Sequence, residues 1–383
     1  MVDSDKTVPD EDPGMSRDDV DCTTDFDFSV DEAYDTQGDA SEITRVSDEH
    51  DELKLPEQVG RYSLGQVLGR GAFGAVVLGR DTQLNRDVAV KLPHLGEADS
   101  KWDIEGEFLQ EARQLAQVTH PDIVSVFDVG VDEGVCFIVS DYLAGKNLKQ
   151  WLHTNKPSWQ ESARIVAAVA DALAAAHAAH TVHRDVKPAN IILNERAEGH
   201  VPILVDFGLA LSQETKLRRG KVSGTPSYMS PEQVRGQADQ IDGRTDIYSL
   251  GVVFYSMLSG ELPFASDNVK ELLRRVLVDD VRPPRQFVHS IPREVERICM
   301  KAMSRSAVDR YNTAGDFAAE LRAAIKQEQS QAQSLTAPAP AADSGRARES
   351  VRILVADDHE LTRFKLQTDL ELMVKLTFTN RRM

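Results

Sequence analysis

The sequence predicts an α+β fold with two lobes, a small β-rich lobe followed by a larger α-helical lobe. Residues 61–95 form short β-branched runs interrupted by glycine, which is typical of antiparallel strands. Two more strand-like runs follow, VSVFDVG and VCFIVSDY, and helical periods occur over 104–118, over 159–180 and several times between 245 and 326. Since strands precede helices and do not alternate with them, we expect two packed lobes with a ligand cleft between them.

The acidic residues are concentrated at the N-terminus. The chain has 383 residues and a net charge of −18, and residues 1–58 contain 20 acidic and 4 basic residues. This segment therefore carries −16 of the net charge. Because it is also poor in aliphatic residues, we expect a disordered acidic tail over 1–58. The nearly neutral remainder argues against a nucleic-acid-binding protein, which would present a basic face.

The cysteines and the apolar segments indicate a cytoplasmic protein. The chain has three cysteines, Cys22, Cys136 and Cys299. They are odd in number, far apart and without metal-ligand spacing, so we expect reduced thiols. No signal peptide is recognised at the start. The most apolar helical stretch, 162–180, is interrupted by Arg164, Asp171 and His177, so we expect no membrane span.

A glycine motif lies within the first strands. The run GRGAFGAV contains Gly69, Gly71 and Gly74. In dinucleotide-binding folds the same spacing opens a helix after a strand. Here β-branched AVVLGRD follows and closes a hairpin, which favours a glycine-rich flap whose backbone amides lie over phosphates. Lys91, 17 residues after Gly74, would pair with those phosphates, and Glu111 is the acid expected to hold its ammonium.

Two downstream motifs complete a set with a family resemblance. HRDVKPAN contains Asp185, Lys187 and Asn190, and VDFG contains Asp206. With the glycine motif and VAVK, these motifs resemble the protein kinase family, specifically the bacterial eukaryotic-like (Hanks-type) Ser/Thr kinases, over roughly residues 61–325. The resemblance implies a two-lobed protein kinase fold that transfers the γ-phosphoryl group of ATP to protein Ser or Thr hydroxyls, with ATP and Mg²⁺ as cofactors.

The resemblance also assigns roles to particular residues. It makes Asp185 the acceptor of the substrate hydroxyl proton and Lys187 the support of the transferred phosphate. The remaining catalytic pair is Lys91 with Glu111, and the expected magnesium ligands are Asn190 and Asp206. The nucleotide is expected to bind against ten residues: Leu68, Gly69, Gly71, Gly74, Val76, Ala89, Lys91, Asp141, Leu143 and Ile192.

Other matching positions are expected to be structural. The family buries an ion pair where this chain has Glu232 and Arg310, and it supports the catalytic loop with an acid where this chain has Asp246. His183 matches an apolar position, together with Phe207 and Leu115, so we interpret its ring as packed and not as a base.

Two positions depart from the family pattern. Ser140 occupies the gatekeeper position beside the adenine site, where bulkier side chains are common. Between Gly208 and Ser230 the chain carries a run of four cations, Lys216, Arg218, Arg219 and Lys221. Thr215 and Ser223 remain nearby as plausible phosphorylation sites. A charge run is also typical of a solvated surface, and both interpretations stay open.

The C-terminal part resembles a fragment of another domain. Residues 326–350 are polar and rich in Pro, Ala and Ser, which indicates a flexible linker. Over 351–383, VRILVADDHELTRFKLQTDL resembles the first strand, acidic pair and first helix of a response-regulator receiver. A receiver has about a hundred residues or more. The chain ends 26 residues after Asp357, so we expect Asp357 and Asp358 to belong to a truncated remnant.

These observations favour a Ser/Thr protein kinase over two rivals. A nucleotide-binding pseudokinase that signals by docking would be expected to lose one of Lys91, Asp185, Asn190 and Asp206, and all four are present. A phosphorelay protein would need the missing receiver core. The expected partners are protein substrates with Ser or Thr acceptors, with autophosphorylation as a further reaction, and no nucleic acid.

Overall fold

The computed structural model describes residues 55–71, 74–93, 112, 116–196, 199–207 and 226–336. The chain divides into two units, Met1–Leu321 and Arg322–Met383. Both sheets and the candidate site lie in the first unit. Several expected features lie outside the described residues: the acidic tail up to residue 54, most of the helix expected over 104–118, the cationic run and the receiver-like segment.

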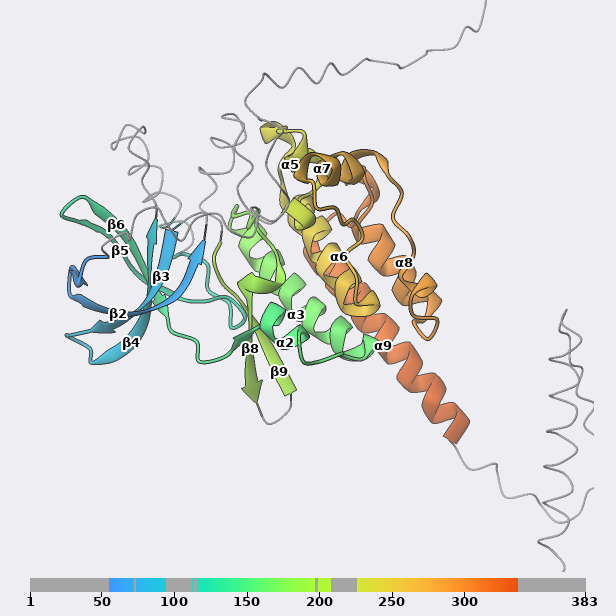
Figure 1. Cartoon of the computed structure of the whole chain (residues 1–383). Helices are drawn as coiled ribbons and strands as arrows, with labels where there is room; N and C mark the ends of the chain where they lie inside the picture. Colours follow the sequence, from blue (N-terminus) through green and yellow to red (C-terminus); the bar gives the residue numbers. More distant parts are fainter. Residues whose placement is uncertain are drawn as a thin grey trace, which may run out of the picture. The chain divides into compact units, whose positions relative to one another are not determined.

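The small lobe is a six-stranded antiparallel sheet (Figure 1). Its strand order is β1-β2-β3-β4-β6-β5, where the strands are β1 (Gln58–Val59), β2 (Tyr62–Gly71), β3 (Gly74–Asp81), β4 (Arg86–Pro93), β5 (Val126–Asp132) and β6 (Val135–Asp141). Alternate residues of β3 and β4 are buried, such as Val77, Val88 and Val90, because successive side chains of a strand point to opposite faces. These residues pack with Tyr62 and Phe137 into one hydrophobic cluster.

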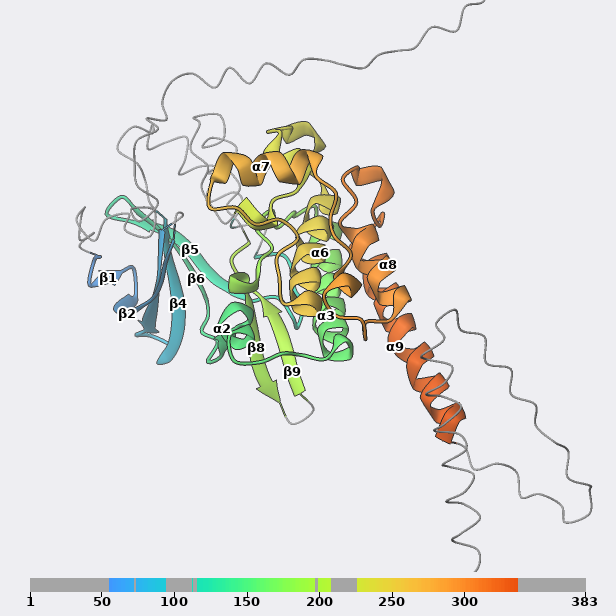
Figure 2. The same cartoon turned by 45° about the vertical axis from the view of Figure 1, so that its right-hand side comes forward.

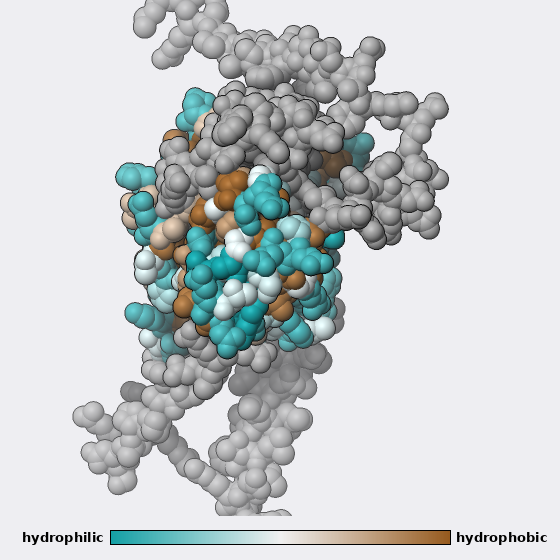
Figure 3. Space-filling model, turned by 90° about the vertical axis from the view of Figure 1, so that its left-hand side faces the viewer, coloured by the Kyte–Doolittle hydropathy of each residue, from teal (hydrophilic) through white to brown (hydrophobic). Residues whose placement is uncertain are grey.

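The outer surface of this lobe mixes polar and apolar side chains. Figure 3 views it from the side of the six-stranded sheet and shows teal and brown residues interspersed. The exposed large apolar side chains there include Leu84 and Phe127, and the Arg86 guanidinium lies 3.7 Å from the centre of the Phe127 ring. Such scattered apolar residues are normal on a protein surface.

The larger lobe begins with a small sheet and continues into helices. The sheet has the order β7 (Lys146–Asn147), β8 (Ile191–Arg196), β9 (Gly199–Leu204). The helices are α2 (Leu148–Leu152), α3 (Trp159–Ala178), α5 (Pro231–Val234), α6 (Gly243–Ser259), α7 (Val269–Val278), α8 (Arg293–Ala302) and α9 (Ala314–Thr336). Short 3₁₀ turns join them: η1 (Pro188–Asn190), η2 (Pro226–Tyr228), η3 (Ala238–Gln240), η4 (Pro284–Gln286) and η5 (Ala307–Asp309).

Helix α6 is the centre of the larger lobe. Its residues from Thr245 to Tyr255 are all buried, and α3 and α8 both lie next to it (Figure 1, Figure 2). Its ends follow ordinary capping rules: the Asp242 side chain accepts from the Arg244 N–H, and Gly260 adopts a φ of 78°. A helix buried on nearly every side makes a rigid support for the loops that pack against it.

The order of elements confirms the predicted fold class. Strands come first and helices afterwards, with β5 and β6 where VSVFDVG and VCFIVSDY predict them. Helix α3 covers Trp159–Ala178, against a predicted range of 159–180. Helix α9 extends to Thr336, into the segment that we expected to be a linker. In the part of the chain that the structure describes, no helix combines the length and the apolar character of a membrane span.

Candidate active site

The glycine motif forms a β-hairpin. Gly69 pairs with Val76 and Gly71 pairs with Gly74 across the antiparallel strands β2 and β3. The glycines therefore join two strands and do not open a helix, as the sequence indicates. Gly74 has a φ of 131°, and a Cβ atom there would lie 2.0 Å from the Leu92 carbonyl oxygen. Only glycine fits this close approach of two backbones.

One face of the sheet carries three of the ten residues predicted to contact the nucleotide, together with Ser140. Val76 lies opposite Lys91, and Ala89 lies opposite Ser140. Residues directly opposite each other in an antiparallel pair share a face, so these four side chains line the same side of the sheet. Leu68 is an exposed residue on β2, whereas Asp141 ends β6 and Leu143 follows it. Ile192 lies on β8, in the second sheet.

Lys91 forms an ion pair with Asp206. The distance from Lys91 Nζ to Asp206 Oδ1 is 3.0 Å, and the two side chains are 17% and 38% exposed. The low-polarity surroundings alone would raise the pKa of the Asp206 carboxyl, but the charge and hydrogen bond of Lys91 lower it below its ordinary value. The sequence predicts Glu111 as the partner of Lys91, and Glu111 lies outside the described residues. No motif in the sequence predicts the contact of Lys91 with Asp206.

The catalytic loop, residues 183–190, contains three predicted residues, and two of them, Lys187 and Asn190, donate hydrogen bonds to the carboxylate of the third, Asp185. Lys187 Nζ donates to Asp185 Oδ2 at 2.7 Å, and the Asn190 side-chain amide donates to the Asp185 backbone oxygen at 2.9 Å and to Oδ2 at 3.1 Å. The side chains of Asp185 and Lys187 are 14% and 16% exposed. The two hydrogen bonds to Oδ2 restrain the rotamer of Asp185, and its side chain stays partly exposed.

Asp246 binds the backbone of the catalytic loop through hydrogen bonds. Its fully buried carboxylate accepts the N–H groups of His183 at 2.8 Å and Arg184 at 2.7 Å. Arg184 has a φ of 63°, an uncommon conformation for a residue other than glycine that persists only where the surroundings enforce it. His177 Nε2 lies 2.7 Å from the same carboxylate. Sequence reasoning did not single out His177 as a partner of Asp246; its place six residues before His183 was the available signal.

His183 is a packed ring in the interior. Its Nε2 lies 3.1 Å from the Val205 carbonyl oxygen, and its Nδ1 faces the backbone N–H of Asp185 at 3.3 Å. Its ring centre lies 4.6 Å from that of Phe207. Burial lowers the pKa of His183, so the neutral ring with its proton on Nε2 satisfies both contacts. This geometry leaves no proton-transfer role for His183.

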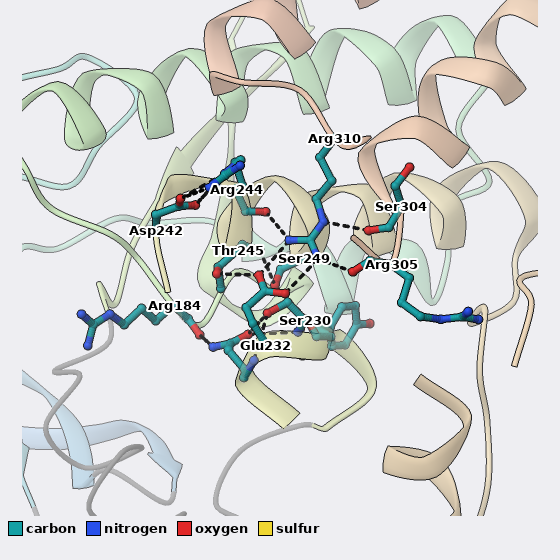
Figure 4. A network of polar contacts seen from close by, with 12 residues as sticks. Arg184, Ser230, Glu232, Asp242, Arg244, Thr245, Ser249, Ser304, Arg305 and Arg310 are labelled. Carbon is teal, nitrogen blue, oxygen red and sulfur yellow. Dashed lines mark hydrogen bonds and ion pairs between the residues drawn. The ribbon is translucent and has the colours of Figure 1, made fainter. Parts of the chain in front are cut away.

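The ion pair expected between Glu232 and Arg310 is present and buried (Figure 4). Arg310 makes two parallel bonds to the Glu232 carboxylate at 2.7 and 2.8 Å. Its other N–H groups donate to the carbonyl oxygens of Arg244, Ser304 and Arg305. All five donors of the guanidinium are therefore used, which offsets the cost of burying the charge. Burial alone would raise the pKa of Glu232, but Arg310 lowers it.

The ion pair is connected to the catalytic loop through α5. Gln233, the next residue of α5 after Glu232, donates its side-chain N–H to the Arg184 carbonyl oxygen at 2.8 Å. Thr245, at the start of α6, donates to Glu232 at 2.8 Å. Helix α5 is thus fixed at one point to the loop that carries Asp185 and at another to α6.

Asn190 and Asp206 suit a magnesium ion. The Val205 N–H donates to the Asn190 backbone oxygen at 2.9 Å, which brings the two predicted ligands close together. An amide oxygen and a carboxylate are hard oxygen donors, and Mg²⁺ usually takes one or two such protein ligands together with substrate phosphates and water. Among the described residues no group of three or more His, Cys, Asp or Glu side chains could hold a metal.

The comparisons with known proteins agree with this geometry. The protein kinase domain matches residues 62–321. The serine/threonine-protein kinase PknB of Mycobacterium leprae is 38% identical over 275 residues, and PrkC of Bacillus subtilis is 32% identical over 307 residues. These matches cover 70% and 79% of this chain, but only 43% and 44% of the relatives, so the chain spans less than half of their length.

A solved structure resembles the fold. The PknI kinase domain of Mycobacterium tuberculosis is 26% identical, with a TM-score of 0.57, and the match covers 72% of this chain and 99% of that domain. The matched family residues include Lys91, the catalytic loop and Asp206, which the structure brings together. The chain belongs to the protein kinase family, in the group of bacterial Hanks-type kinases.

Proposed function

We propose that the chain transfers the γ-phosphoryl group of ATP to serine and threonine hydroxyls of proteins. The observation that carries the proposal is the arrangement around Asp185, whose carboxylate is held by Lys187 and Asn190 in the same unit as the Lys91–Asp206 ion pair. Phosphoryl transfer depends mainly on positioning and on cations that stabilise the charge of the transferred group. The residues present supply both.

The proposed roles follow from these contacts. Asp185 accepts the proton of the attacking hydroxyl, and Lys187, 2.7 Å from that carboxylate, stabilises the phosphoryl group as it moves. Lys91 binds phosphate oxygens of the nucleotide, and Glu111 holds its ammonium in the active state. Asn190 and Asp206 would hold Mg²⁺, which neutralises phosphate charge when it is bound.

The nucleotide is proposed to bind under the β2–β3 hairpin. Gly69, Gly71 and Gly74 supply backbone N–H groups, whereas Val76 and Ala89 cover the base from the sheet and Ile192 from the second lobe. Asp141 and Leu143 offer backbone groups to the edge of the base. The shared face of Val76, Ala89 and Lys91 supports this placement.

The remaining assignments are proposed on the sequence. We assign residues 1–58 to an acidic tail, 61–325 to the kinase domain, 326–350 to a linker and 351–383 to a receiver-like segment. We also propose autophosphorylation, no nucleic-acid partner and a cytoplasmic location. Two buried cysteines that are free thiols, Cys136 and Cys299, suit the reducing environment of that compartment.

A transfer assay tests the proposal. The purified full chain is incubated with γ-labelled ATP, Mg²⁺ and a generic basic protein, and the labelled residues are identified by acid hydrolysis. We expect label on serine or threonine and none without Mg²⁺. Nucleotide binding without any transfer would contradict the proposal and favour a docking function.

A further inference from the structure

A polar pocket lies in the larger lobe on the side of α5 that faces the α8–α9 connection. Its volume is about 630 Å³. Eight residues line it: Glu232, Arg235, Gln240, Ser304, Arg305, Ser306, Ala307 and Asp309. None of them belongs to the nucleotide site or the catalytic loop. A volume of several hundred cubic ångströms lies within the range of ligand sites, and this lining is more polar than that of most such sites.

The lining is rich in hydrogen-bond donors that the fold does not use. The Arg235 side chain makes no hydrogen bond or ion pair with any other described residue; only its backbone N–H donates, to the Pro231 carbonyl oxygen. Over the same described ranges, the side chains of Gln240, Ser304 and Ser306 form no hydrogen bond either. Arg305 donates to the Asp279 carbonyl oxygen at 2.7 Å and lies 3.3 Å from the carboxylate of fully exposed Asp280. The two arginines come from different segments, Arg235 directly after α5 and Arg305 from the connection after α8.

The two arginines of the lining can bind an anion. The Glu232 carboxylate is neutralised by its two bonds to Arg310, whereas Arg305 is paired with the fully exposed Asp280, a weak contact that a bound anion would displace. Asp309 is the remaining acid of this lining, against Arg235. A phosphomonoester carries about −1.5 to −2 charges and three acceptor oxygens, and arginine groups bind it with two parallel hydrogen bonds. A single carboxylate would satisfy fewer of these donors.

Both walls of the pocket are connected to the catalytic loop. On one wall, Gln233 lies between Glu232 and Arg235 and donates to the Arg184 carbonyl oxygen, one residue before Asp185. On the other, the carbonyls of Ser304 and Arg305 accept from Arg310, which holds Glu232; Figure 4 shows the Arg305 side chain extending away from this ion pair. A ligand that draws Arg235 toward residues 304–306 therefore acts on α5.

We propose that this pocket is a regulatory site for a phosphorylated serine or threonine residue of a peptide segment. The bound phosphate contacts Arg235 and Arg305, and its binding alters the turnover number through α5 and the Gln233–Arg184 contact. The binding step is independent of the proposed kinase activity, whereas the effect on turnover rests on it.

Binding is measured with a short fluorescent peptide that carries one phosphoserine, against the full chain after phosphatase treatment. Matched probes carry serine or glutamate at that position. We expect the phosphopeptide alone to bind, and Arg235→Gln or Arg305→Gln to weaken binding about tenfold or more, the loss expected for one charged hydrogen bond. The control Arg293→Gln removes an exposed arginine at the start of α8 and should leave the affinity unchanged.

Three results would overturn the site. They are equal binding of the phosphoserine and serine probes, equal binding of the glutamate probe, and an affinity that Arg235→Gln and Arg305→Gln leave unchanged. Since Arg235 is exposed, its variant should keep the wild-type melting temperature, so that a loss of binding reports on the site and not on folding.

Turnover of a peptide substrate tests the regulatory part. Saturating phosphopeptide should change kcat of the wild-type chain, whereas Arg235→Gln should keep the basal kcat and lose the response. A kcat that does not respond in the wild type would overturn the regulatory part. The source of the phosphate is tested by prior incubation with ATP: weaker probe binding afterwards means that the chain's own phosphorylated residue fills the pocket, and unchanged binding means a residue of another protein.

Discussion

Asp246 contributes no group to the proposed reaction, yet it accepts the backbone N–H groups of His183 and Arg184 immediately before Asp185. The side-chain amide of an asparagine would point its NH₂ group at one of these two N–H donors. That donor would lose its acceptor, which should lower the free energy of unfolding by about 1–3 kcal/mol. We therefore expect Asp246→Asn to lower both the melting temperature and kcat, the latter by about tenfold or more, since small displacements of a catalytic group cost large factors in rate.

The control for this variant is Asp81→Asn. Asp81 is also fully buried and accepts two backbone N–H groups, those of Gln83 and Leu84, but it lies at the end of β3. It should lose a similar amount of stability and keep kcat per folded molecule. Equal kcat values for the two variants, measured below their melting temperatures, would show that Asp246 acts on stability alone.

Ser140 determines the space behind the proposed adenine site. It lies opposite Ala89 on the adjacent strand, so two small side chains face each other there. We expect the wild type to use ATP analogues enlarged at the exocyclic amine, and Ser140→Met to reduce kcat/KM for the analogue by about tenfold or more relative to ATP. The control is Ser63→Met, at an exposed position of β2. If the ratio of kcat/KM for the analogue to kcat/KM for ATP is the same in the wild type, Ser140→Met and Ser63→Met, Ser140 does not lie behind the adenine site.

At the scale of elements, the Glu232–Arg310 pair fixes α5 to the turn before α9. Removing one partner leaves a buried charge uncompensated, so Glu232→Gln should cost about 3–5 kcal/mol at neutral pH. The exposed control Glu261→Gln should change stability by about 0.5 kcal/mol or less. Chemical denaturation of both variants measures the difference, and similar values would mean that the pair contributes little.

The same pair predicts a pH dependence. The pKa of Glu232 is lowered from its ordinary value of 4.5, so its contribution is complete above that pH and is lost as the pH falls through the lowered value. The melting temperature of the wild type should therefore fall below about pH 4.5, more steeply than that of Glu232→Gln. If the melting temperatures of the wild type and of Glu232→Gln fall by the same amount from pH 6 to pH 3, the pH dependence does not come from Glu232.

The elements were largely predictable because their signals are local. The β-branched runs of β2 to β6, the periodicity of α3 and the glycine spacing all depend on neighbours in sequence. The motif residues Asp185, Lys187 and Asn190 also lie within six positions, and the fold brings them into contact. The contact of Lys91 with Asp206 could not be derived in this way, because it joins residues 115 positions apart.

Other features depend on tertiary packing. The positive φ of Arg184 follows from Asp246, 62 positions away, and the polar pocket combines two segments that have no motif in common. No periodicity or spacing indicates either. Residues whose partners are distant in sequence are thus the part of the site that needs the folded structure.

At the scale of the whole molecule, the last buried residue of the described chain is Ile325, on α9, where burial is described as far as Ser330. Deleting residues 345–383 should therefore leave kcat and the melting temperature nearly unchanged. A melting temperature lower by several degrees in the shortened chain would mean that this segment stabilises the kinase domain.

The most direct test of the proposed mechanism compares nucleotide affinity and phosphoryl transfer in Asp185→Asn. Asparagine keeps the size of the side chain but does not accept the substrate proton, and general base catalysis contributes about 10²–10⁴-fold. We predict ATP affinity equal to that of the wild type and a single-turnover rate lower by about that factor. A variant that transfers phosphate to serine or threonine at the wild-type rate would contradict the assignment of Asp185 and with it the proposed mechanism.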